Sequence, residues 1–139
     1  MSMKQAIIVL LFLLSTNCYA SNDCSIYAYL QNFSENIATI QTKRYIIRID
    51  EMQNGDLRYV SWKNKTITDE PDLILYDGVY EHEGSWPNVS YTFRKDDYTY
   101  KIYRNGVQDE FDNPYKYNLI IYRGTHRIMN YGGNDYKCN

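Results

Sequence analysis

The sequence predicts an all-β fold, an antiparallel meander that closes into a small β-barrel of about seven to eight strands. The 139 residues include 16 tyrosines against four phenylalanines and two tryptophans. Tyrosine favours strands, and its amphipathic ring suits a surface half buried against a core. Many of the tyrosines alternate with polar residues, and Asn-Gly pairs at residues 54–55 and 105–106 separate the alternating runs,.

The first half of the chain contains three predicted strands. In the run 45–52 the side chains of Tyr45, Ile47 and Ile49 share one side, and the Asn-Gly pair predicts a hairpin that returns as residues 57–62,. The run 72–80 is apolar on both faces at its centre. We therefore expect it to form one well-buried strand.

The second half contains two predicted hairpins. Residues 90–94 and 98–103 flank a polar turn, and residues 117–122 and 126–131 flank an Arg-Gly-Thr turn,. Because Tyr98 and Tyr100 share a face with Ile102, we expect both tyrosine rings to point into the barrel.

The stretch 25–42 supports two interpretations. Its apolar residues recur at spacings of four and three, as on one face of a helix, which favours a short helix within residues 25–36. Its β-branched content favours instead a bent strand through residues 38–44 that continues into the Tyr45 strand. The apolar positions are Ile26, Leu30, Phe33, Ile37 and Ile40.

Residues 1–20 have the pattern of a cleaved export signal. Lys4 precedes an apolar run over residues 6–14, and small residues at Cys18 and Ala20 predict cleavage after Ala20,. The apolar run is shorter than the about 20 residues that span a bilayer as a helix. We therefore expect a periplasmic or secreted protein without a stable membrane anchor, whose residues 21–139 form a single β-barrel-like domain.

Removal of the signal leaves two cysteines, Cys24 and Cys138, at the two ends of the mature chain. In an oxidising compartment they predict one disulfide that joins both termini. Closing a loop of roughly 100 residues stabilises a fold by about 4–5 kcal/mol on the chain-entropy model. Two free or intermolecular thiols are the alternative.

The composition excludes some classes of function. With 15 basic and 17 acidic residues the net charge is −2, which argues against a nucleic-acid partner,. The sequence contains no His or Cys ligand spacing typical of metals, no Gly-x-Ser-x-Gly and no Gly-rich phosphate loop,. We therefore expect no enzyme, no cofactor and no metal site, and we interpret the acidic runs 69–72 and 109–114 as solvated loops rather than calcium sites.

Exposed aromatic residues beside polar neighbours are the candidates for binding. Flat tryptophan and tyrosine faces on a rigid sheet can stack on sugar rings, whereas the alternative is that these aromatic residues serve as strand formers. His82 lies in an acidic loop sequence, Glu-His-Glu-Gly, before the second tryptophan. The candidate binding residues are Trp62, Trp86, His82 and Tyr103.

The layout of an export signal, a domain of about a hundred residues, terminal cysteines and a meandering barrel resembles the small periplasmic lysozyme inhibitors of bacteria. Those proteins present a Ser-Gly-x-x-Tyr-like loop to the enzyme. Residues 54–62 keep a Gly and a Tyr but not the Ser or the spacing, so no residue role is carried over.

Three functional hypotheses follow. The first is an exported non-enzymatic protein of the cell envelope that binds another protein, as an inhibitor or immunity factor against an exported enzyme would. The second is a β-barrel that binds a glycan or a small ligand. The third is an enzyme that uses His82 with neighbouring carboxylates.

Overall fold

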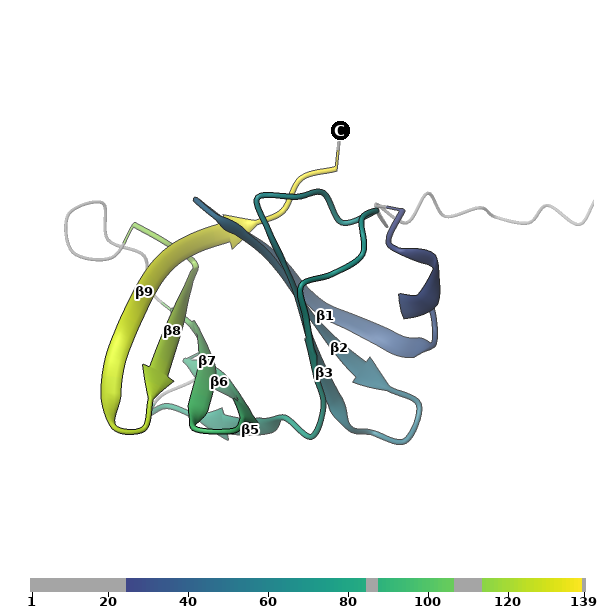
Figure 1. Cartoon of the computed structure of the whole chain (residues 1–139). Coiled ribbons are helices and arrows are strands. Elements are labelled where there is room, and N and C mark those ends of the chain that lie inside the picture. The colour runs from purple at the N-terminus through teal and green to yellow at the C-terminus, as the bar shows by residue number, and fades with distance from the viewer. Residues whose placement is uncertain (1–24, 85–87, 107–113, 139) are drawn as a thin grey trace, which may run out of the picture.

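A computed structural model describes residues 25–84, 88–106 and 114–138 (Figure 1). Its regular structure is one 3₁₀ turn and antiparallel strands, which confirms the predicted all-β class. None of the helical structure in this part of the chain is long and apolar enough to cross a membrane. The elements are η1 (Ala28–Leu30), β1 (Phe33–Thr42), β2 (Tyr45–Met52), β3 (Leu57–Lys63), β4 (Leu73–Leu75), β5 (Val79–His82), β6 (Val89–Lys95), β7 (Tyr98–Arg104), β8 (Tyr117–Arg123) and β9 (His126–Asp135).

The strands form one sheet in the order β4-β3-β2-β1-β9-β8-β7-β6-β5. Sequential hairpins build each half, and the first and last strands join the halves through pairs such as Ile40 with Asp135. The sheet curls into the half-barrel seen in Figure 1, where β9, β8 and β7 lie opposite β3. The prediction of a meander that closes toward a barrel is confirmed.

The prediction of a single buried strand over residues 72–80 is wrong. The chain breaks at Asp77, whose φ of 58° is incompatible with a strand, and β4 and β5 pair with opposite ends of the sheet. Gly78 lies directly against the Phe93 ring, so the connection has no room there for a side chain. This segment therefore crosses between the two sheet edges, and all of β5 is exposed.

The stretch 25–42 is mostly strand. The helical interpretation is reduced to η1. The strand interpretation is right that residues 38–42 are extended, although β1 begins earlier, at Phe33. It is wrong that this strand continues into the Tyr45 strand, because the chain turns after Thr42 and β2 pairs antiparallel with β1. An isolated helix of this length is only marginally stable. As a strand, β1 forms backbone hydrogen bonds with β2 on one side and with β9 on the other.

Two apolar clusters stabilise the sheet. The inner cluster fills the concave side, and the outer cluster lies on the convex side of β2 and β3 beneath η1 and the loop 64–70. The inner cluster contains Tyr59, Phe93, Ile102, Leu119 and the partly buried Tyr98 and Tyr100, so the expectation that these two tyrosines point inward is confirmed. The outer cluster contains Ile26, Leu30, Ile46, Val60, Trp62 and Ile67.

The predicted export signal and Cys24 lie outside the described residues, so the disulfide stays a prediction. The chain near both cysteines nevertheless converges. Ile26 packs in the outer cluster, and Tyr136 packs against that same cluster while its backbone N–H donates to the Thr39 carbonyl at 2.8 Å.

We expect replacement of Cys24 and Cys138 together by serine to lower the free energy of unfolding by about 2–5 kcal/mol. The physical reason is the loop-closure entropy that an unlinked unfolded chain regains. Urea unfolding of the wild type and the double variant under non-reducing conditions measures the difference. Equal midpoints, or two reactive thiols in the native wild type, would contradict the pairing.

Candidate functional site

Trp62, a predicted binding residue, lies in the core. Its side chain is completely buried in the outer cluster, and its indole Nε1 donates to the Asp69 carbonyl at 2.8 Å. The ring faces η1 and the loop rather than solvent because that covering segment packs over the convex face. Trp62 therefore has no free face on which a ligand could stack.

The other predicted binding residues do not form one site. His82 shares a cross-strand row with Val89, which belongs to the inner cluster, whereas Tyr103 lies beside Ser90 on the other face of the sheet. The His82 ring meets the Tyr80 ring edge-on at 5.2 Å, and the Tyr103 ring lies 4.7 Å below an ammonium group, that of the neighbouring lysine on β7. Trp86 lies outside the described residues.

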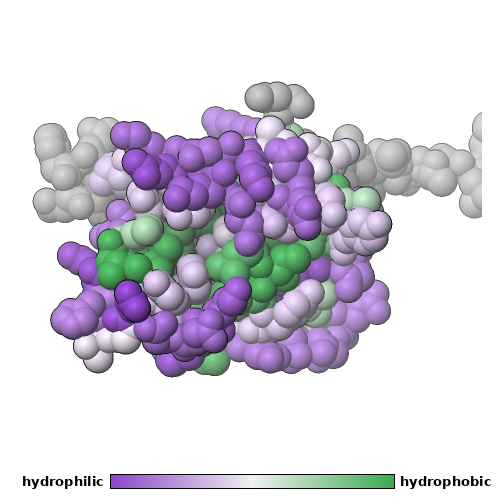
Figure 2. Space-filling view, in the orientation of Figure 1, coloured by the Kyte–Doolittle hydropathy of each residue, from purple (hydrophilic) through white to green (hydrophobic). Residues whose placement is uncertain are grey.

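A cavity of about 330 Å³ lies on the concave side, between β3 and β4 on one side and β7, β8 and β9 on the other. Figure 2 shows hydrophobic surface gathered across the middle of the face that Figure 1 presents, with hydrophilic surface above and below it. The lining combines tyrosines with aliphatic and a few polar side chains: Tyr45, Tyr59, Ser61, Lys63, Asp72, Leu73, Tyr98, Tyr100, Ile121, Ile128 and Met129.

Alternation along the strands positions the tyrosine rings. Tyr59 on β3 reaches across the half-barrel to Tyr100 on β7, with ring centroids 5.5 Å apart, and Tyr45 on β2 lies 5.6 Å from Tyr131 on β9. These residues come from four different strands, so only the closing of the sheet brings them together. The sequence indicated that Tyr98 and Tyr100 point inward, but not what they would face.

These phenols are protonated at neutral pH, and burial raises their pKa further,. Desolvation is the main cause that raises the pKa of Tyr45, Tyr59 and Tyr100, and nearby tyrosines raise the pKa of each further. The hydroxyls thus lie close enough to influence one another. At neutral pH each can donate a hydrogen bond into the cavity as well as accept one.

We expect the free energy of unfolding to be constant up to about pH 9 and to fall above about pH 10. A raised folded-state pKa means that the unfolded chain loses phenolic protons first, so the stabilisation is complete below the unfolded pKa of about 10 and is lost above it. Each such tyrosine contributes up to about 1.4 kcal/mol per pH unit. Denaturant unfolding from pH 7 to 11.5 measures the slope. Tyr59→Phe should reduce it, and a flat profile in the wild type would contradict the buried tyrosine cluster.

Two charged residues lie at the cavity. Asp72 is already occupied, because its carboxylate accepts the Lys63 backbone N–H at 2.7 Å and pairs with the Lys65 ammonium at 3.0 Å. The backbone hydrogen bond is the first cause that lowers the pKa of Asp72. The exposed Lys63 ammonium forms none of the ion pairs found in the described ranges.

A second hollow of about 320 Å³ lies beside the β2–β3 hairpin, and most of the residues that line it are polar. Three of its polar side chains already have hydrogen-bond partners in the protein. The Asn54 amide donates to the Asp56 carboxylate at 3.0 Å, and the Asn32 amide oxygen accepts from the Arg58 guanidinium at 2.9 Å. It therefore offers a ligand fewer free groups than the tyrosine-lined cavity.

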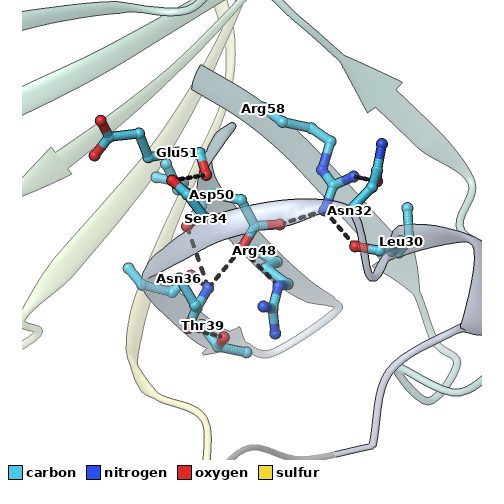
Figure 3. A network of polar contacts seen from close by, with 11 residues as sticks. Leu30, Asn32, Ser34, Asn36, Thr39, Arg48, Asp50, Glu51 and Arg58 are labelled. Atoms are coloured by element: carbon cyan, nitrogen blue, oxygen red, sulfur yellow. Dashed lines mark hydrogen bonds and ion pairs between the residues drawn. The ribbon is translucent and has the colours of Figure 1, made fainter. Parts of the chain in front are cut away.

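A buried ionic cluster supports the convex face of the sheet (Figure 3). Asp50 is fully buried between two guanidinium groups, with Arg48 Nε at 2.7 Å from one carboxylate oxygen and Arg58 Nη2 at 2.8 Å from the other. The Asn36 amide also donates to Asp50, and Arg58 also donates to the Leu30 carbonyl. Arg48 Nη2 and Arg58 Nε are buried without a hydrogen-bond partner in the part of the chain described.

This ionic cluster is structural. Arg58 on β3 binds both Asp50 on β2 and the Leu30 carbonyl at the end of η1. These contacts hold η1 over the outer cluster. Sequence reasoning missed it because Arg48 and Asp50 occupy the alternate positions that normally face water in an antiparallel strand. The available signal was the β2–β3 hairpin register, which places Arg58 directly opposite Asp50.

Within the described residues, no group of three or more His, Cys, Asp or Glu side chains could hold a metal ion. The acidic run 69–72 is engaged locally, with Asp69 accepting from the Thr66 backbone N–H at 2.9 Å. Most of the run 109–114 lies outside the described residues. Comparisons with protein families, with curated proteins and with solved structures find no match to this chain.

Proposed function

We propose that this protein is an exported, non-enzymatic binding protein that holds a small amphipathic ligand in the tyrosine-lined cavity. The observation that carries the proposal is a cavity of about 330 Å³ whose walls combine aliphatic side chains with protonated phenol groups. Small-molecule sites are concave, about 300–1,000 Å³ in volume and mostly apolar, with a few convergent polar groups. A barrel of about eight strands is just wide enough for one small ligand.

The surroundings of the cavity suit binding. Tyr59 is almost fully buried and packs against Phe93 as well as Tyr100, so this wall is held by the inner cluster before any ligand arrives. A preformed wall reduces the entropy that binding must overcome. Ile128, by contrast, is 45% exposed and lies at the cavity.

Replacement of Ile128 by tryptophan tests the proposal, because the larger ring would occupy the cavity. The probes are two sets of small amphipathic compounds, on octyl and 3-phenylpropyl skeletons, each as the alcohol, the carboxylate and the ammonium. We expect at least one compound to raise the melting temperature of the wild type and to lose most of this effect with Ile128→Trp.

Ile74→Trp is the matched control, since Ile74 is 38% exposed but does not line the cavity. This variant should keep the ligand-induced shift. The proposal fails if no compound of either set shifts the wild-type melting temperature, or if both tryptophan variants respond alike.

A second candidate function, binding of a protein partner in the envelope, is favoured by a different surface. The β4–β5 crossing exposes four large apolar residues within seven positions: Ile74, Tyr76, Val79 and Tyr80. Contiguous exposed apolar surface is typical of protein-interaction sites. An inhibitor or immunity factor would present such a rigid edge to its target enzyme.

The double variant Tyr76→Ser/Val79→Ser tests this second function. Both side chains are about half exposed, so their loss should leave the fold intact. We expect cross-linking in envelope extract to recover a partner with the wild type and not with the variant. Equal recovery with both proteins, or none with either, would count against the β4–β5 crossing as a docking surface.

A further inference from the structure

The charges at the tyrosine-lined cavity are not balanced. The Asp72 carboxylate has two partners, the Lys63 backbone N–H and the Lys65 ammonium, whereas the Lys63 ammonium lies within ion-pair distance of no carboxylate among the described residues. The charges of Lys63 and Lys65 both act on the single Asp72 carboxylate, so a ligand that enters meets a net positive charge. This favours an anionic group on the ligand.

The tyrosine hydroxyls favour the same sign of charge. Tyr45, Tyr59 and Tyr100 line the same cavity, and the Tyr59 and Tyr100 ring centroids are 5.5 Å apart. Phenols are protonated at neutral pH, so each can donate a hydrogen bond. Hydrogen bonds from neutral donors to a charged acceptor are stronger than those between neutral groups. Tyrosine faces can also attract cations, but the neighbouring Lys63 ammonium would repel a cationic ligand.

The aliphatic wall of the cavity indicates the polarity and the size of the rest of the ligand. Leu73, Ile121, Ile128 and Met129 offer no hydrogen-bond partner, so the hydroxyls of a sugar placed against them would be desolvated without compensation,. At about 30 Å³ for each water-sized unit, the cavity of about 330 Å³ holds on the order of ten non-hydrogen atoms,. An apolar body of this size fits the aliphatic wall.

We propose that the cavity binds a small monocarboxylate with an apolar body, its carboxylate at Lys63 and the tyrosine hydroxyls and its chain against Ile121, Ile128 and Met129. This inference rests on the proposed function and names the ligand class of the same site. Octanoate, with ten non-hydrogen atoms, is the matching probe, and 1-octanol and octylammonium are its neutral and cationic counterparts.

Calorimetric titration of the full mature protein with the three octyl compounds tests the inference. We expect octanoate to bind at least about fivefold more tightly than 1-octanol and octylammonium to bind most weakly. The variant Lys63→Gln should remove the advantage of octanoate while leaving the affinity for 1-octanol unchanged. Added salt should weaken octanoate binding and not octanol binding.

Lys43→Gln is the matched control, because Lys43 is also exposed, in the β1–β2 turn, and does not line the cavity. It should keep the preference for octanoate. If 1-octanol or octylammonium binds as tightly as octanoate and Ile128→Trp still abolishes binding, the carboxylate inference is overturned and the proposed function stands. If none of the three compounds binds, the test counts against the proposed function as well.

Discussion

Replacement of Asp50 by asparagine is expected to lower the free energy of unfolding by about 3–5 kcal/mol. Asp50 is fully buried and holds the guanidinium groups of Arg48 and Arg58, which are themselves almost inaccessible. Asparagine keeps the shape but removes the charge, so two cations remain buried without an anion between them. The penalty for leaving buried charge uncompensated is larger than the net contribution of the intact ion pairs.

Urea unfolding measured by far-UV circular dichroism checks this value. Asp97→Asn is the control, since the Asp97–Arg123 pair is about 60% exposed on both sides and should contribute at most about 1 kcal/mol,. A second variant that makes all three buried residues apolar, Arg48→Met/Asp50→Leu/Arg58→Met, should be more stable than Asp50→Asn alone. Similar effects for Asp50→Asn and Asp97→Asn would show that the cluster is not buried as described.

Replacement of Trp62 by alanine is expected to lower the free energy of unfolding by about 3–5 kcal/mol. The side chain is the largest among the fully buried ones, and it fills the outer cluster beneath η1. Alanine leaves a cavity that this cluster cannot close without moving η1. The Asp69 carbonyl also loses the indole N–H that it accepts at 2.8 Å.

The variant Trp62→Phe distinguishes a role of Trp62 in stability from a role in ligand binding. Phenylalanine fills most of the space but cannot donate to Asp69, so it should cost clearly less than alanine. Because Trp62 and the tyrosine-lined cavity lie on opposite faces of β3, octanoate affinity should not change with Trp62→Phe. A stable Trp62→Phe protein with reduced ligand affinity would restore Trp62 as a binding residue.

The alternation of residues predicted most of the strands because each carries a row of apolar side chains on its concave face. Tyr45, Ile47 and Ile49 alternate along β2, and Tyr98, Tyr100 and Ile102 along β7, with turns at the positions that the Asn-Gly pair at 54–55 and the Arg-Gly-Thr sequence indicated. The second Asn-Gly pair, at 105–106, lies directly before residues that the structure does not describe. The same reasoning gave a wrong prediction for residues 72–80. A continuous apolar run is typical of a buried strand, but here it joins the two edges of the sheet and breaks at Asp77.

The candidate site was less predictable because it depends on long-range closure. Trp62 looked accessible, since no local signal reveals that Ile26, Leu30 and Ile67 cover it. The tyrosine-lined cavity joins residues from six strands and the turn before β4, and only their sheet order places Tyr59 against Tyr100. Strand alternation indicates which face a side chain occupies but not its partner on that face.

A methyl NMR titration of the mature protein with sodium octanoate would show directly whether a ligand binds inside the half-barrel. We expect saturable shifts of the Met129, Ile121 and Ile128 methyl signals, with little change at Ile74 on the exposed edge or at Ile46 in the outer cluster. Shifts centred on Ile74 or Ile46, or none that saturate at the cavity methyls, would contradict a ligand site inside the half-barrel.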